Sequence, residues 1–377
     1  MAIYGDTSGI LRDHEQAVHQ NIVLPDNVGG IAYGDADQML DHSRGGDDVL
    51  TAGQFSDNTL FGDAHTMHDK SQGGNDTLTG AGPRDLLYGD AYGMFDHATG
   101  GNDNLVIGGS FNLLFGDAYE MHGHAAGGDD TMVGSPAQIE IGQGPPGWLY
   151  GDGFTMDGHA SGGNDTLTDT AAASGDANIM AGHTRGGNDT IVGGNGRANS
   201  LTGDAQQMTD HAVGGDDTLT ANSGGANSLF GDAQTMSGSA RGGNDTLVGS
   251  NLISFGNMYG DAQTLADHSV GGNDVLIGGR GIDHMWGDAA VVAAGALTGA
   301  DTFVFAPGGG HDDINDFRQS DGDRIDVSAW GFASFEDMTI TGDGTNTTIS
   351  FDDTSSVTLV GFADPHALQG PDFLLLA

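Results

Sequence analysis

The sequence predicts an all-β fold: a parallel β-solenoid, of the β-roll or β-helix kind, with coils of about 28 residues and a small β domain capping its C-terminal end. Three observations support this prediction. A Gly-Asp-Ala step, a Met and a Gly-Gly-Asn/Asp-Asp element (GGND) recur in one fixed order. The second glycine of GGND returns at intervals of 28, 27, 27, 35, 24, 28, 28 and 29 residues. Apolar residues recur beside both elements. A period of this size over most of a chain is typical of stacked coils.

The repeat divides the chain into two regions. Residues 1–298 are predicted to form about ten coils, the first of them degenerate, and residues 299–377 a compact β cap. Within a coil we expect one strand after GGND, a second before the Gly-Asp step, and a weaker third around the Met. Because alternate residues of a strand point to opposite faces, Leu78 and Leu87 should face the interior of their coil.

The chain is strongly acidic. It has 53 Asp and Glu against 10 Lys and Arg, a formal net charge of −43. The acidic residues stand at fixed places in the repeat, which argues against a disordered acidic chain. Such a charge opposes compaction unless cations neutralise it, and it makes nucleic acid and anionic membranes unsuitable partners.

Three classes of feature are missing from the sequence. The chain has no cysteine, so neither a disulfide framework nor a zinc–thiolate site is expected. The N-terminus lacks a basic region followed by an apolar stretch, so we expect no ordinary secretory signal. No apolar run is long enough to span a bilayer, and no membrane span is predicted.

The GGND turns indicate calcium. Glycine carbonyls and a fixed carboxylate are hard oxygen ligands, and Ca²⁺ accepts six to eight of them in irregular geometry, whereas Mg²⁺ requires a tighter octahedron. One turn supplies too few ligands, so we expect each ion to lie between stacked turns and its binding to contribute to folding. The candidate ligands in GGND are Gly46, Asp48, Gly74, Asp76, Gly101, Asp103, Gly128, Asp130, Gly163, Asp165, Gly187, Asp189, Gly215, Asp217, Gly243, Asp245, Gly272 and Asp274. Those in the Gly-Asp steps are Asp35, Asp63, Asp90, Asp117, Asp152, Asp204, Asp232, Asp261 and Asp288.

The element Gly-Gly-Asn-Asp-Thr-Leu-x-Gly resembles part of the RTX (repeats-in-toxin) nonapeptide GGxGxDxUx, whose turns bind Ca²⁺ in a parallel β-roll. The motif's fourth position, a glycine, corresponds to Gly74, Gly101, Gly163, Gly187 and Gly243, its aspartate to Asp76, Asp103, Asp165, Asp189 and Asp245, and its apolar residue to Leu78, Leu105, Leu167, Ile191 and Leu247. The period here is about three nonapeptide lengths, and the motif's first two glycines are missing before most GGND elements. A three-sided or long-armed coil is therefore expected in place of a two-sheet roll, and the number of ions per coil stays open.

The tail from Ala300 is similar to the C-terminal domain that RTX proteins share with serralysin proteases. The resemblance rests on ADTFVF, DRIDVS and a final acidic residue followed by apolar ones. It implies an uncleaved type I secretion signal, made here by Asp372, Phe373, Leu374, Leu375 and Leu376, and recognition by a type I export machinery. It also implies that the protein is secreted to the exterior or surface of a Gram-negative cell, unfolded at low calcium and folded at external calcium.

A second column of the repeat carries histidine, at His42, His97, His124, His159, His183, His211 and His268, with Lys70 and Ser239 in two coils. It predicts either a transition-metal or pH-sensing ladder or a turn residue that contacts the next coil. Since Lys and Ser occupy the same place, we favour the structural interpretation. The Met column is likewise interpreted as core packing.

An enzyme is not expected. His14 and His19 invite comparison with the H-E-x-x-H zinc helix, but they are five residues apart where that helix requires four. Two function classes remain. The first is a secreted structural protein that self-assembles end to end into a fibre, surface layer or matrix. The alternative is a calcium-dependent binding module, such as a lectin, an ice binder or a host-contact protein, with cell-surface polysaccharide as one possible ligand. End-to-end assembly requires an open N-terminal end, unless residues 7–30 fold over it.

Overall fold

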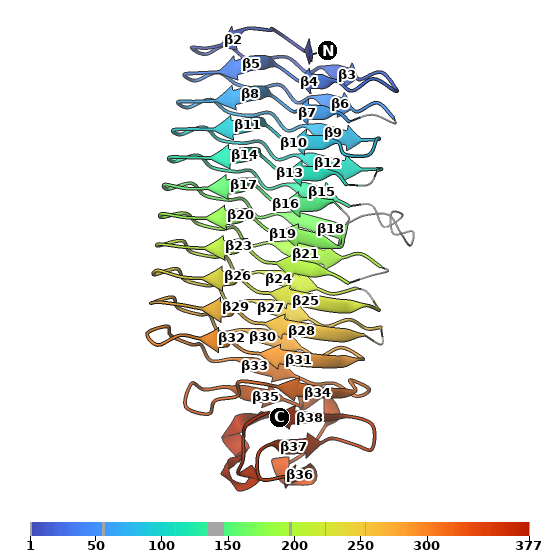
Figure 1. The fold of residues 1–377 in the computed structure, drawn as a ribbon, viewed down its shortest axis with the longest axis vertical. Coiled ribbons are helices and arrows are strands. Elements are labelled where there is room, and N and C mark those ends of the chain that lie inside the picture. Colours follow the sequence, from blue (N-terminus) through green and yellow to red (C-terminus); the bar gives the residue numbers. More distant parts are fainter. Residues whose placement is uncertain are drawn as a thin grey trace.

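The computed structural model describes residues 2–54, 57–109, 111–134, 147–195, 198–222, 224–252 and 254–376, and it confirms the predicted β-solenoid (Figure 1). Each coil contributes one strand to each of three sheets, called sheets A, B and C here. Sheet B has eleven strands in the described residues, one for each coil. The coil is therefore three-sided, and the weak third segment around the Met is a regular strand.

Sheet A contains the strand that precedes each Gly-Asp step. Its neighbours pair in parallel register, so that Leu86, Leu87 and Tyr88 lie beside Leu113, Leu114 and Phe115. In spatial order its strands are β1 (Ala2–Tyr4), β4 (Ile31–Tyr33), β7 (Thr59–Phe61), β10 (Leu86–Tyr88), β13 (Leu113–Phe115), β16 (Trp148–Tyr150), β19 (Ala172–Ser174), β22 (Ser200–Thr202), β25 (Ala226–Phe230), β28 (Phe255–Tyr259), β31 (Ile282–Trp286), β34 (His311–Ile314), β38 (Ser356–Leu359), β37 (Thr347–Ser350) and β36 (Thr339–Gly342).

Sheet B contains the strand that ends at the Met. Met39 lies beside Met67, and Met94 beside Met121, so the Met column follows the sheet. Its strands are β2 (Ile10–Leu11), β5 (Ala36–Met39), β8 (Ala64–Met67), β11 (Ala91–Met94), β14 (Ala118–Met121), β17 (Gly153–Met156), β20 (Ala177–Met180), β23 (Ala205–Met208), β26 (Ala233–Met236), β29 (Ala262–Leu265) and β32 (Ala289–Val292).

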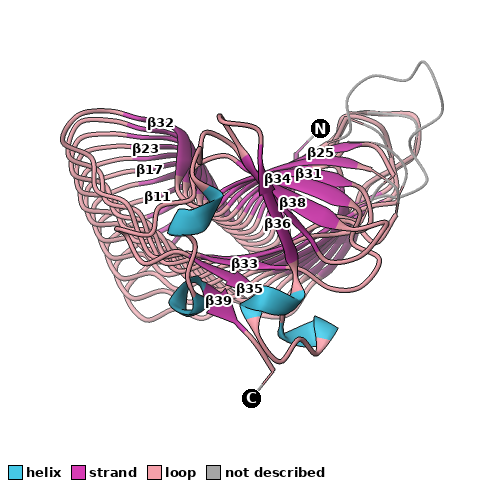
Figure 2. Ribbon diagram, turned by 90° about the horizontal axis from the view of Figure 1, so that it is seen from below, coloured by secondary structure: helices cyan, strands magenta, loops and turns pink. Residues whose placement is uncertain are grey.

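Sheet C contains the strand that follows GGND. Its strands are β3 (Asn21–Val23), β6 (Val49–Thr51), β9 (Thr77–Gly80), β12 (Asn104–Ile107), β15 (Thr131–Val133), β18 (Thr166–Thr170), β21 (Thr190–Gly193), β24 (Thr218–Thr220), β27 (Thr246–Val248), β30 (Val275–Ile277), β33 (Thr302–Val304), β35 (Arg324–Asp326) and β39 (Phe373–Leu374). Seen along the axis of the solenoid, sheet B forms one lobe of the cross-section and sheets A and C form the other (Figure 2).

Each lobe has its own hydrophobic core. The core between sheets A and C is a double column of leucines, and Leu78 and Leu87 are both fully buried there, as predicted. The core of the sheet B lobe contains the Met column and the alanines of the segment that returns toward GGND, such as Ala98. The structure therefore confirms the packing role of the Met column, in which the flexible side chain fills the gaps between coils.

The aromatic residues before the Gly-Asp steps stack from coil to coil. Tyr4, Tyr33, Phe61, Tyr88, Phe115 and Tyr150 form one continuous stack, with ring centroids 4.7 to 5.3 Å apart and nearly parallel planes. Ser174 and Thr202 interrupt the column, which resumes at Phe230 and continues through Tyr259 to Trp286. The stack holds successive coils in register along one edge of sheet A.

The C-terminal region continues two of the three sheets. β34 and β38 extend sheet A, and β37 and β36 close it as an antiparallel hairpin, while β35 and β39 extend sheet C. Sheet B ends at β32 in the described residues. Four short 3₁₀ helices complete this end: η2 (Ser328–Trp330), η3 (Phe335–Asp337), η4 (Pro365–Ala367) and η5 (Gly370–Asp372). The division of the chain at residue 298 into two domains stays a prediction.

No helix in the described part of the chain is both long enough and apolar enough to cross a membrane.

Candidate metal centre: two rows of buried aspartates

The boundary between the two cores is lined by two parallel rows of aspartates. The GD row comes from the Gly-Asp steps between sheets A and B and consists of Asp35, Asp63, Asp90, Asp117, Asp152, Asp176, Asp204, Asp232, Asp261 and Asp288. The ND row comes from GGND, just before sheet C, and consists of Asp48, Asp76, Asp103, Asp130, Asp165, Asp189, Asp217, Asp245, Asp274 and Asp301. None of these twenty side chains is more than 2% exposed. The structure thus brings every aspartate predicted as a ligand into one buried site.

Backbone N–H groups fix the orientation of both rows. In the GD row, the carboxylate of Asp90 accepts hydrogen bonds from the N–H of Gly101, the second glycine of its own coil's GGND. In the ND row, Oδ1 of Asp103 accepts a 2.6 Å hydrogen bond from the N–H of Asp76 in the preceding coil. The second glycines of GGND therefore hold the GD row through their N–H groups, a role that was not predicted for them.

The second oxygen of the ND row is left without a partner. Oδ2 is buried and makes no hydrogen bond at any of the ten ND-row aspartates. In the GD row one oxygen is equally unpaired at Asp35, Asp117, Asp152, Asp176, Asp204, Asp232 and Asp261. Buried polar atoms without a partner are rare because each costs free energy, and a line of them indicates a ligand that these oxygens bind.

The surroundings of these oxygens are also acceptors. A β-carbon at Gly62 would lie 1.7 Å from the carbonyl oxygen of Gly89 and 2.0 Å from Oδ2 of Asp76. Only glycine fits there, and the two oxygens, which are both acceptors, lie close together. This arrangement suits a cation. The glycines of the Gly-Asp steps, such as Gly89, were not among the predicted ligands, because their proximity to the ND row depends on the register of the coils.

Neighbouring carboxylates of the GD row also converge. A β-carbon at Gly73, the first glycine of its GGND, would lie 1.7 Å from Oδ1 of Asp90 and 2.6 Å from Oδ2 of Asp63. The carboxyl groups of Asp63 and Asp90 are close enough to hydrogen-bond when one of them is protonated. Two adjacent buried carboxylates cannot both be ionised at low cost unless a cation lies near them.

The pKa values of these aspartates also show that their ionised forms are unfavourable in the buried rows. Burial, together with repulsion from Asp48 and Asp6, raises the pKa of Asp35 to about 7, although its hydrogen bonds act in the opposite direction. Burial also raises the pKa of Asp217 to about 8, and it raises that of Asp103 well above the ordinary range, with added repulsion from Asp90 and Asp76. In the absence of a cation, the folded state therefore favours protonated aspartates.

One member of the rows has a cationic side chain beside it. Nη1 of Arg318 lies 3.2 Å from Oδ2 of Asp288. Among the described residues, no other member of either row forms an ion pair with a basic side chain. Asp288 is also absent from the aspartates with an unpaired oxygen. The chain thus supplies a cation at Asp288, while Asp63 and Asp90 are satisfied by backbone N–H groups and the oxygens left unpaired have no basic side chain as a partner in the described residues.

The donor set fits calcium better than a metal bound by side chains alone. In the part of the chain that the structure describes, no group of three or more His, Cys, Asp or Glu side chains is arranged to enclose a metal ion by itself. Two carboxylates per coil must therefore be supplemented by backbone carbonyls and water. Ca²⁺ accepts such mixed oxygen ligands, whereas zinc and copper favour nitrogen and sulfur.

The histidine column lies on the surface, away from the rows. The rings of His97, His124, His159, His183 and His211 are exposed and stack at 4.8 to 5.0 Å. A metal ion binds a histidine nitrogen in the plane of its ring, so parallel stacked rings do not share one. This geometry favours the structural interpretation. A cavity of about 350 Å³ lies along the column and is lined by Asp41, His42, Asp69, Lys70, Asp96 and His97.

His14 belongs to the same column. Its ring lies 5.1 Å from that of His42, and Nδ1 of His19 contacts the carbonyl oxygen of Asp47. The two histidines are therefore parts of the first coil and do not lie on a helix.

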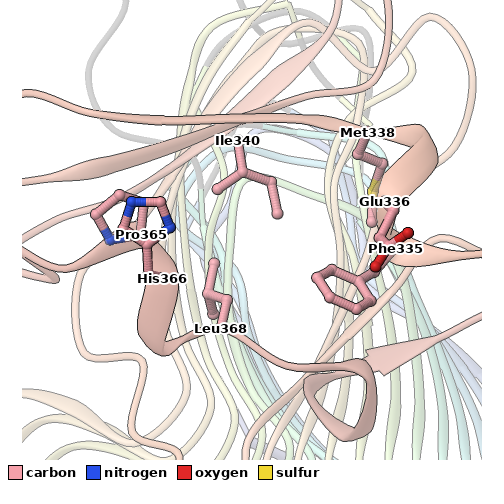
Figure 3. Close-up of a pocket in the computed structure, with 7 residues that line it drawn as sticks. All are labelled: Phe335, Glu336, Met338, Ile340, Pro365, His366 and Leu368. Atoms are coloured by element: carbon pink, nitrogen blue, oxygen red, sulfur yellow. The ribbon is translucent and has the colours of Figure 1, made fainter.

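A further cavity of about 350 Å³ lies in the C-terminal region, between η3, β36 and η4 (Figure 3). It is lined by Phe335, Glu336, Met338, Ile340, Pro365, His366 and Leu368. None of these residues belongs to the aspartate rows.

Comparison with known proteins adds little. No protein-family model matches the chain, and no curated protein matches it. Among solved structures, the chain is similar to the AlgE6R2 subunit of the mannuronan C5-epimerase from Azotobacter vinelandii, whose solution structure is known. The two are 24% identical, the match covers 45% of this chain and 94% of that one, and the TM-score is 0.25. A likeness of this degree carries no functional argument, so function is argued from the aspartate rows.

Proposed function

We propose that this protein is a calcium-dependent structural protein of the RTX kind, secreted from the cell, whose coils fold around a row of Ca²⁺ ions. The observation that carries the proposal is the line of buried, unpaired aspartate oxygens. Each interior coil contributes two buried carboxylates, so one divalent ion per coil would balance their charge. Ca²⁺ is preferred to Mg²⁺ because the ligands are spread over two coils and include carbonyls, which suits a large, irregularly coordinated ion.

Ion binding and folding would then be one process. Without the ion, each added coil places two more carboxylates in a buried, like-charged row, and the cost of burying an unpaired charge is several kcal/mol. The unfolded chain leaves those carboxylates in water. A ligand that binds only the folded state shifts the equilibrium toward it by mass action. Calcium concentration would therefore decide whether the solenoid forms.

This coupling supports the proposed export route. In the folded protein the candidate secretion signal is part of the structure: Phe373 is buried, its ring stacks on Phe335 at 5.8 Å, and β39 pairs with β35. An export machinery would have to recognise the signal before this end folds. A chain that stays unfolded at low calcium meets that requirement, and the location we propose is extracellular.

The proposal includes self-assembly of the molecules end to end. Within the described chain, β1, β2 and β3 pair with the second coil on one side and with nothing on the other. The rival interpretation, in which residues 7–30 fold over this end, is disfavoured because β2 and β3 lie in sheets B and C as strands of a first coil. Open strand edges are templates for pairing with another chain.

The first coil also exposes apolar side chains. Val18, Val23 and Val28 are each more than half exposed. We therefore propose that the first coil of one molecule docks against the C-terminal end of the next, which builds filaments rather than closed dimers. The C-terminal cavity in Figure 3 lies at that end, and both apolar residues such as Ile340 and Leu368 and the polar Glu336 and His366 line it.

The alternative function, a calcium-dependent module that binds cell-surface polysaccharide, would require exposed aromatic faces. The aromatic column instead stacks on itself, and Tyr88 and Phe115 are buried in it. Assembly therefore stays the first proposal.

Light scattering and electron microscopy of the full chain, with and without calcium, test this function. We expect monomers that fold and then form filaments as calcium is added, and Val23→Lys should weaken association while leaving calcium-induced folding intact. The matched control is Leu252→Lys, because Leu252 is also an exposed apolar residue but lies far from the first coil. A protein that stays monomeric at high concentration in calcium would overturn assembly and favour the binding module.

A further inference from the structure

The N-terminal end of the aspartate rows is closed by an amide. In the first coil, Gln20 occupies the position that Asp48 occupies in the second, and its N–H donates the same hydrogen bond, to Oδ1 of Asp48 at 2.6 Å. Its side-chain Nε2 donates to Oδ1 of Asp6 at 3.0 Å. The other oxygen of Asp6 accepts from the N–H of Val18 at 2.7 Å. Both oxygens of Asp6 are therefore satisfied by the chain itself.

The C-terminal end is closed by a guanidinium group. Nη1 of Arg318 lies 3.2 Å from Oδ2 of Asp288 and 3.5 Å from Oδ2 of Asp321. The backbone N–H of Arg318 donates to Oδ2 of Asp323 at 2.7 Å. Beyond the last member of the GD row, Asp316 accepts from the N–H groups of Gly287 and Asp288 at 2.8 and 3.1 Å.

The interior of the rows contrasts with both ends. The GD-row neighbour of Asp288 in the preceding coil, Asp261, keeps an unpaired Oδ2, and so does Asp232 before it. Their GGND partners Asp274 and Asp245 keep one as well. From Asp117 to Asp261 every GD-row member keeps an unpaired oxygen, and this series stops at Asp288, which Arg318 contacts. At the other end, no acidic residue stands at the ND position of the first coil.

We infer that Gln20 and Arg318 are built-in end caps of the cation row, with Arg318 standing where a cation stands in the interior coils. This inference rests on the proposed calcium row and specifies where that row begins and ends. An ion at either end would have ligands from one coil only and would bind weakly. An amide donor at one end and a fixed guanidinium at the other satisfy the terminal carboxylates at the Gly-Asp positions, Asp6 and Asp288, without an ion. The chain therefore fixes the number of ions it binds, and a joint between molecules contains no shared ion.

The test counts ions. Full-length protein is equilibrated with calcium by dialysis, and bound calcium per chain is measured by elemental analysis. A second count comes from the dependence of the thermal midpoint on calcium concentration, which reports the ions released on unfolding. Arg318→Gln removes the guanidinium and should raise both counts by one. Gln20→Asp restores the acidic pattern in the first coil and should also raise them by one.

Two matched controls carry the same change of charge outside the rows. Arg280→Gln and Gln72→Asp alter exposed side chains and should leave both counts unchanged. If the wild type binds calcium but neither Arg318→Gln nor Gln20→Asp gains an ion, the end caps are refuted while the calcium row stands. If Arg318→Gln does not fold at saturating calcium, Gln20→Asp decides. A wild type that binds no calcium refutes the proposed function itself.

Discussion

The N–H of Asp48 donates a 2.6 Å hydrogen bond to Oδ1 of Asp76, the equivalent residue of the next coil, while Oδ2 of Asp76 has no partner. One carboxylate thus joins two coils through one oxygen, while its other oxygen is buried and unpaired near the carbonyl oxygen of Gly89. The same relationship recurs along the whole ND row. It explains why an aspartate stands there in ten consecutive coils: an asparagine could make the hydrogen bond, but it would not supply the charge.

That distinction gives the first prediction. Asp245→Asn preserves the acceptor for the N–H of Asp217, a 2.7 Å hydrogen bond, and removes only the charge of the unpaired oxygen. We expect the calcium midpoint for folding to rise by about tenfold or more, as for the loss of groups that support a metal site. Asp267→Asn is the matched control, because Asp267 is exposed and asparagine tolerates its left-handed backbone (φ 57°). Equal shifts for both variants would mean that calcium acts only by general charge screening.

A second prediction concerns the space around the rows. Gly73→Ala would place a β-carbon 1.7 Å from Oδ1 of Asp90, with the carboxylate held between two coils. We expect a loss of about 1–3 kcal/mol or more in the free energy of unfolding in calcium, the usual cost of overpacking. At Gly9 a β-carbon would approach nothing closer than Oγ1 of Thr7, at 3.4 Å, so Gly9→Ala should be tolerated. Urea unfolding measures both, and equal stability of the two variants would contradict this packing.

A third prediction concerns pH in the absence of calcium. Burial, the first cause at each site, brings the pKa of Asp48 to about 6, of Asp261 to about 7 and of Asp217 to about 8, from 3.8. A group whose pKa is higher in the folded state binds its proton more tightly there. Its contribution to stability is therefore complete below about pH 4 and is lost as the pH rises through about 6 to 8.

The calcium-free protein should consequently be more stable at pH 5 than at pH 8, whereas acid should weaken the calcium-bound protein, because protons compete for the same oxygens. Thermal midpoints of protein freed of calcium by dialysis measure the effect. A calcium-free protein that is equally stable at both values, or less stable at pH 5, would contradict the buried rows.

A fourth prediction concerns export. Removing residues 372–377 deletes the candidate signal, and we expect the protein to remain in the cytosol of a cell that carries its export machinery. The deletion also removes the contact between Phe373 and Phe335, so a control must disturb that contact alone. Phe335→Ala does so and should still be exported, as measured by comparing medium and cell fractions. Undiminished secretion of the truncated protein would refute the carried-over signal.

Much of the fold follows from the sequence because each coil repeats the same pattern of apolar residues, glycines and aspartates. The period fixes the stacking, and the spacing of Leu78 and Leu87 places both in one core. The candidate ligand aspartates are recognisable because they recur beside glycines, and all those predicted are buried in the two rows. Asp176 was not among the predicted ligands; it lies in the irregular coil whose GGND interval shortens to 24 residues.

The remaining features depend on contacts between coils that no single repeat reveals. Asp301 continues the ND row, since β33 pairs with β30 and aligns Thr302 with Val275, but its GGND is reduced to Thr-Gly-Ala-Asp. Arg318 stands 30 residues from Asp288, outside the period, so only the folded chain shows that they meet. The Asn58–Asp85–Asn112 ladder at the turn between sheets C and A was also missed. There the backbone N–H and the side-chain amide of Asn58 donate to Oδ1 of Asp85, and the N–H of Asp85 donates to Oδ1 of Asn112.

The central claim is that the solenoid folds around calcium, and far-ultraviolet circular dichroism of the full chain at pH 7.5 tests it most directly. Freed of divalent ions, the protein should lose most of its β signal. About millimolar Ca²⁺ should restore it, as for extracellular calcium modules, while Mg²⁺ or NaCl at matched ionic strength should not. A protein that stays folded and thermally stable without divalent ions at this pH would contradict the account.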